Sequence, residues 1–130
     1  MTAMGTKEIS REQWPEFFER FTSRHAGWLV TVEVDDPDLG AQELARDVPL
    51  LEMSAETHGG SPPVISITAG RSREGHVTHR IDAPTRVRLL QTPEGADEAL
   101  ETESAGGAKT LVRFRAAALP ETVDGLIPEP

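Results

Sequence analysis

The sequence has no cysteine and no tyrosine, and six of its 130 residues are aromatic. The absence of cysteine excludes disulfides, thiolate zinc sites, iron–sulfur clusters and cysteine nucleophiles. No apolar run approaches the roughly 18 residues that a membrane-spanning helix needs, and residues 1–7 have no apolar signal-peptide core. We therefore expect a cytoplasmic protein of one domain, with an ordered core over about residues 9–126 and flexible tails at 1–8 and 127–130.

Enzyme and metal motifs are absent too. There is no Gly-x-Ser-x-Gly, no Gly-rich phosphate loop and no dinucleotide fingerprint. The pair His76-x-x-His79 falls on a predicted strand, where positions i and i+3 point to opposite faces and cannot share a metal. We expect His79 to be a core histidine with one hydrogen bond. A cluster of acids lacks the spacing of a calcium loop and indicates a turn between strands: Asp35, Asp36, Asp38 and Glu43.

We therefore expect no metal ion, no cofactor and no catalytic residue. A paired-carboxylate site stays open, because its two members need not be near each other in the sequence.

Five of the six aromatic residues gather in one segment, from Trp14 to Trp28, and the sixth is Phe114. Four of them follow the i, i+3, i+4, i+7 spacing of one helix face: Trp14, Phe17, Phe18 and Phe21. Large rings dominate core burial, so we interpret this stripe as the part of the core that a single amphipathic helix contributes.

The ends of this helix carry recognisable signals. Ser10 and Gln13 have the spacing of a capping box. Pro15 is expected to separate a first turn from the main helix, and Gly27 to stop it. His25 lies near the C-terminus, where a protonated ring favours the helix dipole, and we assign it no function.

The rest of the chain alternates apolar and polar residues with a period of two between turn residues, which predicts strands. They span 28–35, 42–48, 50–57, 64–70, 76–81, 85–90, 96–104 and 110–115, with Pro49 ending the second, and one helical turn is expected at 119–123. No crossover helices separate them, so the sheet should be antiparallel. We predict an α+β domain, with one N-terminal amphipathic helix packed on a curved, mostly antiparallel sheet or small barrel of about seven strands.

Two hairpins are predicted with a register. A three-residue loop, Asp82-Ala83-Pro84, would pair Ile81 with Thr85 and put the apolar residues of both strands on one face. An odd-length loop around Gly106-Gly107 would set Leu100 against Phe114, joining apolar residues across the strands.

Charge is unevenly distributed in this acidic chain, whose net charge is −9. Residues 71–88 hold five arginines, whereas residues 92–107 hold five acids and no basic residue. If the first hairpin forms, one exposed face combines basic residues that suit an anion or an acidic partner. The candidate binding residues are Arg71, Arg73, His76, Arg80, Arg86 and Arg88.

A competing interpretation is a solvated sheet face whose arginines pair with the acidic stretch 94–103 of a neighbouring strand. Nucleic acid is disfavoured as a ligand, because no aromatic residue that could stack on bases lies among the arginines.

Several segments resemble a bacterial family of small stand-alone α+β proteins that is known only as a domain of unknown function. The resemblance rests on Ile9-Ser10-Arg11 with Trp14 and Phe17-Phe18, on Gly27-Trp28-Leu29-Val30, on Thr78-His79 with Pro84-Thr85-Arg86-Val87, and on residues 96–100. It covers about residues 8–126 and implies a bacterial cytoplasmic protein with no assigned activity.

Two hypotheses about function follow. The first is a noncatalytic interaction or regulatory module that presents the arginine face to an acidic protein partner, or to a second copy of itself through the acidic segment. The alternative is an enzyme or small-ligand binder with a pocket between helix and sheet that includes His79.

Overall fold

The computed structural model describes residues 5–57, 62–72 and 74–118. A 3-10 turn (η1, Arg11–Gln13) leads into one α-helix (α1, Trp14–His25). The strands are β1 (Gly5–Ile9), β2 (Leu29–Asp36), β3 (Gly40–Glu56), β4 (Val64–Gly70), β5 (His76–Asp82), β6 (Pro84–Gln91), β7 (Asp97–Ser104) and β8 (Lys109–Ala118). No helix in the described part of the chain is long and apolar enough to cross a membrane.

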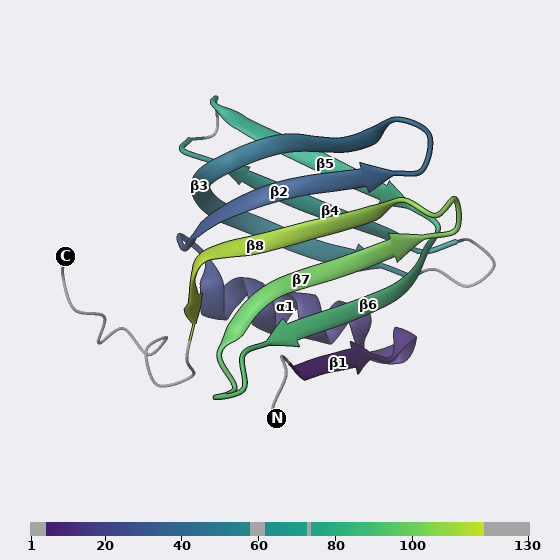
Figure 1. Cartoon of the computed structure of the whole chain (residues 1–130), viewed down its shortest axis with the longest axis horizontal. Coiled ribbons are helices and arrows are strands. Elements are labelled where there is room, and N and C mark those ends of the chain that lie inside the picture. Colours follow the sequence, from purple (N-terminus) through teal and green to yellow (C-terminus); the bar gives the residue numbers. More distant parts are fainter. Residues whose placement is uncertain (1–4, 58–61, 73, 119–130) are drawn as a thin grey trace, which may run out of the picture.

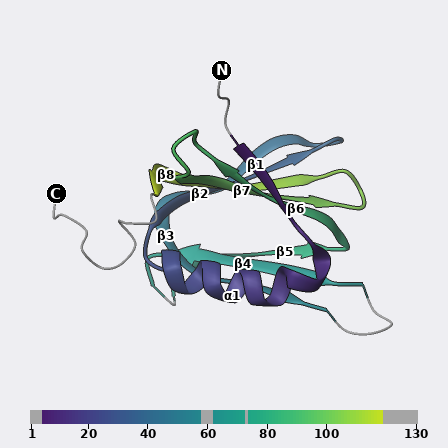
Figure 2. The ribbon, with the colours of Figure 1, turned by 90° about the horizontal axis from the view of Figure 1, so that it is seen from below.

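The strands form one antiparallel sheet of eight, in the order β1-β6-β7-β8-β2-β3-β4-β5. The sheet curves back on itself without closing, so that β4 and β5 lie behind β2 and β8 (Figure 1). Helix α1 packs along the second half of β3, in the same layer as β4 and β5 (Figure 2). The prediction of one helix on a curved antiparallel sheet is confirmed.

Strand β3 joins the two layers, because its halves pair with different partners. Residues up to Pro49 pair with β2, and residues from Leu50 onward pair with β4. The prediction that Pro49 ends a strand is wrong. It stands where the ladder changes partners, next to a kink at Asp47, whose φ is 51°. Beyond this point α1 takes the place of β2: Thr22 Oγ1 donates to the Met53 carbonyl at 3.0 Å and accepts from the Met53 amide at 2.9 Å.

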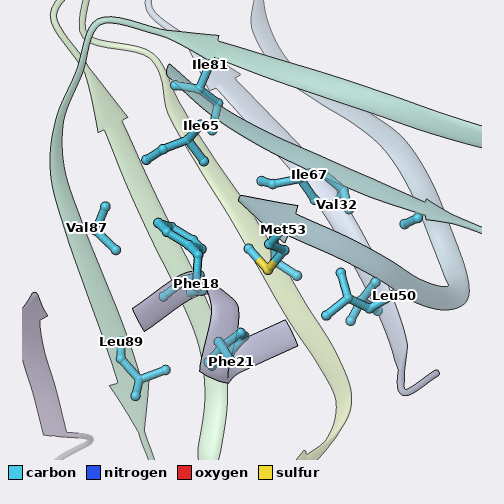
Figure 3. Close-up of a cluster of buried hydrophobic side chains, with 14 of the residues drawn as sticks. Phe18, Phe21, Val32, Leu50, Met53, Ile65, Ile67, Ile81, Val87 and Leu89 are labelled. Carbon is cyan, nitrogen blue, oxygen red and sulfur yellow. The ribbon is translucent and has the colours of Figure 1, made fainter. Parts of the chain in front are cut away.

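The core lies between the layers. Phe18 and Phe21 of α1 point among apolar side chains of β3, β4 and β6 (Figure 3). Phe18 is fully buried and Phe21 is 4% exposed. Their neighbours in Figure 3 include Leu50, Met53, Ile65, Ile67, Val87 and Leu89. The interpretation of the aromatic stripe as core is confirmed for these two residues and Trp14, while Phe17 is half-buried.

The start of the helix differs from the prediction at two points. The expected capping box does not form, because the Ser10 side chain makes no cap hydrogen bond, although its carbonyl accepts from the Gln13 amide at 2.9 Å. Residues 5–8, expected to be disordered, belong to β1 and pair with β6. Trp14 Nε1 ties this strand to the helix by donating to the Ile9 carbonyl at 3.0 Å. As predicted, Pro15 follows a separate first turn and Gly27, with φ of 89°, follows the helix end.

The predicted hairpin of residues 76–90 is wrong. Strand β5 pairs with β4, so that Ile81 lies opposite Ile65, and β6 pairs with β1 and β7. The chain turns a corner at Ala83, whose φ of 50° is unusual for a residue with a side chain. The corner carries the chain from one layer to the other instead of folding it back.

The β7–β8 hairpin has the odd-length loop that was expected, but its register differs by two residues. Leu100 pairs with Val112 rather than with Phe114, and Glu101 lies opposite Leu111. A two-residue shift keeps every side chain on its face, so Leu100 still has an apolar partner. Arg113 instead forms an ion pair with Glu33 of β2 at 3.0 Å. The predicted turn at 119–123 and tail at 127–130 lie outside the described residues.

One glycine is predicted to be essential for the β4–β5 connection. A Cβ on Gly70 would overlap the backbone of Gly75 and His76, so we expect Gly70→Ala to lower the free energy of unfolding by about 1–3 kcal/mol, as overpacking does. Urea denaturation checks this, with Gly106→Ala as control, because a Cβ there meets nothing within 4 Å. Equal stability of the two variants would contradict the tight approach.

Candidate functional site

The described structure has a pocket between α1 and the edge of the sheet formed by β1, β6 and β7. Its volume is about 260 Å³. Four apolar side chains line it, namely Ile9, Phe17, Phe21 and Leu89. Its polar lining consists of Lys7, Arg20, Arg24, Gln91 and Asp97. A cavity with an apolar wall and a few convergent polar groups is the usual form of a small-molecule site.

The helix and β1 supply the cations of this pocket. Arg20 and Arg24 are one turn apart on α1, and Lys7 comes from the edge strand. Arg20 is bound to Glu16 at 2.8 Å, and Glu16 lines a neighbouring hollow rather than this pocket. Within the described residues, Lys7 and Arg24 take part in no ion pair. Three cations therefore surround one carboxylate, in a chain whose net charge is −9.

Behind the pocket, Asp97 meets a fully buried histidine. Nε2 of His25 lies 3.2 Å from Oδ2 of Asp97, without the alignment of a hydrogen bond. The other carboxylate oxygen accepts a hydrogen bond from Gln91 Nε2 at 2.9 Å. The Asp97 side chain is 10% exposed, so the pocket reaches the carboxylate while the histidine stays shielded.

These contacts determine the pKa of Asp97. Burial by itself raises the pKa of a carboxyl group. The contacts of Asp97 with His25 and Gln91, and the positive charge of Arg24, outweigh that effect and hold its pKa below the ordinary value. Asp97 is therefore ionised at neutral pH, and it lines the same pocket as the three cations.

The lowered pKa predicts how acid affects stability. A carboxyl group whose pKa is lower in the folded chain stabilises the fold above its unfolded pKa of about 3.9, and this stabilisation is lost as the pH falls through the folded value. We expect Asp97→Asn to be less stable than the wild type at pH 7 and the difference to shrink below about pH 4. Urea denaturation across pH tests this, with Asp35→Asn, on the exposed end of β2, as control. A difference that stays constant down to pH 2 would contradict the assignment.

The structure does not gather the predicted arginine face. Arg86 and Arg88 lie on β6, whereas Arg80 lies on β5, in the other layer. Arg71 and His76 also stay together, because Gly70 pairs with His76 at the β4–β5 turn. Arg73 lies outside the described residues.

Most of the candidate arginines that the structure describes lie close to acidic side chains. Arg80 binds Asp82 at 2.8 Å, and Arg86 lies 3.7 Å from Glu8 of β1. Arg88 contacts Glu101 at 3.4 Å and Glu103 at 3.3 Å. The competing interpretation, that these arginines pair with the acidic stretch on a neighbouring strand, is confirmed for Arg88.

The two histidines of the His-x-x-His pair have separate surroundings. His79 is half-buried rather than in the core, and Nε2 of its ring makes the expected single hydrogen bond, with Thr110 Oγ1 at 3.2 Å. Burial lowers the pKa of this ring. His76 is exposed, with Nδ1 3.3 Å from the Ser72 carbonyl. His79 does not line the pocket between α1 and the sheet, so the expected inclusion of this residue is wrong.

The acids near residue 36 form the predicted turn between β2 and β3. Oδ1 of Asp36 accepts the amides of Asp38 at 2.7 Å and Leu39 at 3.0 Å. In the described ranges, no three histidine or acidic side chains stand close enough together to hold a metal ion.

Comparison with known proteins shows the family to which this chain belongs. The model of the family of unknown function DUF5335 matches residues 5–122. The chain belongs to the DUF5335 family. An uncharacterized protein of Aquifex aeolicus (strain VF5) is 28% identical over 119 residues, which are 91% of this chain and all of the relative. The resemblance to a domain family without assigned function is thereby confirmed.

A solved structure is also similar to this DUF5335 member. The crystal structure of the Bacillus subtilis YojF protein matches with a TM-score of 0.48 and 13% identity, over 88% of this chain and 99% of the other. A likeness of this size does not assign a function.

Sequence reasoning missed both members of the buried pair in this DUF5335 protein. One signal for His25 was present: the buried residues of α1 are Trp14, Phe18, Phe21 and His25, so the histidine continues the core stripe four residues after Phe21. Asp97 carried no such signal, because it is one of five acids in a short acidic stretch. Its partner comes from an element 72 positions away in the sequence.

Proposed function

We propose that this protein is a noncatalytic binding module for a small organic anion with an apolar body, held in the pocket between α1 and strands β1, β6 and β7. The observation that carries the proposal is the lining of that pocket. Cationic side chains stand beside apolar ones in an otherwise acidic protein.

The pocket chemistry favours an anion over a neutral ligand. Arg24 and Lys7 offer charged donors, and hydrogen bonds to charged groups are worth more than neutral ones. Phe17 is half-buried and stacks on Phe21 with ring centroids 5.3 Å apart. These rings and Leu89 provide the apolar wall. A volume of about 260 Å³ suits a compact organic acid.

Neutralising the pocket cations should weaken this binding. We expect the double variant Lys7→Gln/Arg24→Gln to bind hexanoate at least tenfold more weakly, because each lost charged hydrogen bond contributes about 1.5–3 kcal/mol. Isothermal titration calorimetry measures the affinity. Arg113→Gln, which removes a cation on the exposed side of β8, is the matched control and should bind like the wild type.

Two further ligands separate the contributions of charge and apolar surface. Hexanamide has the apolar body without the charge, and acetate has the charge without the body, so both should bind more weakly than hexanoate. If hexanoate binds the double variant as well as it binds the wild type, the pocket is not the anion site.

The charge distribution supports a second proposal. In it, the protein is a module that contacts an acidic protein partner or a second copy of itself. Strand β5 supports this proposal. Within the described residues only one of its two edges is paired, with β4, and its Val77 is 41% exposed. Charge reversal of Arg86 and Arg88, both on β6, should then abolish association in sedimentation or pull-down experiments, and unchanged association would exclude these arginines as the contact. The bacterial origin and cytoplasmic location stay predictions as well.

A further inference from the structure

An oxygen atom lies close to each of the two ring nitrogens of His25. Nδ1 lies 3.0 Å from the carbonyl oxygen of Phe21, and Nε2 lies 3.2 Å from Oδ2 of Asp97. A neutral imidazole carries one N–H and one lone pair. Whichever nitrogen holds the single proton, the other would then direct its lone pair at an oxygen lone pair.

This conflict is costly because the ring is fully buried and water cannot relieve it. A second proton removes it. The proton shared by His25 and Asp97 can reside on either residue, giving an imidazolium with a carboxylate or a neutral histidine with a carboxylic acid. The surroundings of the two groups decide between these arrangements.

The charged and polar neighbours favour the carboxylate. Gln91 of β6 donates to Asp97 at 2.9 Å, a bond that stabilises the ionised form. The charged side chains that line the pocket with Asp97 are Lys7 of β1 and Arg20 and Arg24 of α1, and all three are positive. No second carboxylate lines this pocket in the described structure, so nothing there competes for the proton.

The aromatic neighbours favour the imidazolium. The ring centroid of His25 lies 4.3 Å from that of Phe21, 4.7 Å from that of Phe114 of β8, and 5.9 Å from that of Trp28, which precedes β2. Aromatic faces attract a cation through their quadrupoles, and more strongly away from water. The rings around His25 therefore offset part of the cost of burying a charged imidazole.

We infer that His25 and Asp97 form a buried imidazolium–carboxylate pair, and that the proton on His25 Nε2 sets the charge of the pocket. With that proton in place the pair is neutral overall, and the cations of the pocket attract an anion unopposed. Loss of the proton leaves the charge of Asp97 unbalanced on the pocket wall, which weakens anion binding. This consequence rests on the proposed function, whereas the protonation state of the pair does not.

Long-range ¹H–¹⁵N NMR of the ligand-free, ¹⁵N-labelled protein tests the protonation state directly. At pH 7 we expect both ring nitrogens of His25 to be protonated. His79 is the internal control and should be neutral in the same spectrum, because burial lowers its pKa and no carboxylate faces it. In Asp97→Asn, the doubly protonated form of His25 should be lost at pH 7. A neutral His25 in the wild type would overturn the inference. This measurement uses the wild-type protein and does not depend on the folding of a variant.

Hexanoate binding across pH tests the consequence. We expect the affinity to fall about tenfold as His25 loses its second proton, as a unit charge several ångströms from the anion would produce, and Asp97→Asn to remove this dependence. An affinity for hexanoate that stays constant over the pH range in which NMR shows His25 losing its proton would contradict the role of the proton. If hexanoate binds at no pH, the proposed function fails, and the NMR result still decides the state of the pair.

Discussion

Replacing Phe18 by alanine should destabilise the protein by about 3–5 kcal/mol, the cost of deleting a large buried aromatic ring. Phe18 is fully buried and projects from the single helix among side chains of several strands (Figure 3). The labelled strand residues around it in Figure 3 are aliphatic side chains and one methionine, so removal of the ring leaves a cavity. Urea denaturation followed by circular dichroism measures the loss.

Phe17→Ala is the matched control for this prediction. The two phenylalanines are adjacent on α1, but Phe17 is half-buried and lines the pocket. Its removal should cost about half as much, in proportion to the apolar area that it buries. If both variants lose equal stability, the inward face of α1 is not the centre of the core.

Removing His25 should be comparably severe. His25→Leu leaves Asp97, which is 7% exposed, with a buried charge that has lost its main partner. Breaking a buried ion pair in this way typically costs about 3–5 kcal/mol. The free energy of unfolding at pH 7 tests this, and a loss under about 1 kcal/mol would contradict a charged pair.

Two variants separate the charge effect from ordinary packing. His79→Leu removes a half-buried histidine with one hydrogen bond and should cost about 1 kcal/mol. The double variant His25→Leu/Asp97→Leu removes both charges, and should recover much of the stability that His25→Leu loses, because a hydrophobic pair often replaces a buried ion pair without loss.

Much of the fold was predictable because its signals are local. The spacing of the aromatic residues predicted α1, and the alternation of apolar and polar residues predicted the strands from β2 to β8. Strand β1 had no such signal: Gly5 to Glu8 are exposed and become a strand through backbone pairing with β6. The corner at Ala83 was equally hidden, since a short polar connection between two strands is also what a hairpin looks like.

The candidate site was less predictable, because it depends on which strands become neighbours. The predicted hairpin of residues 76–90 would have placed Arg80 beside Arg86, but the corner at Ala83 separates them. The pocket instead joins Lys7, Arg24 and Asp97, from three elements far apart in the chain. No spacing rule connects such residues, whereas the continuation of the helix stripe to His25 was readable and indicated a buried titratable group.

An amide NMR titration of the wild-type protein with hexanoate tests the central claim most directly. The account predicts saturable shifts confined to α1 from Phe17 to Arg24, to residues 89–91 of β6 and to Lys7 and Asp97, with no comparable response to hexanamide. Shifts that gather instead on the exposed residues of β5, or no saturable shifts at all, would contradict an anion site between the helix and the sheet.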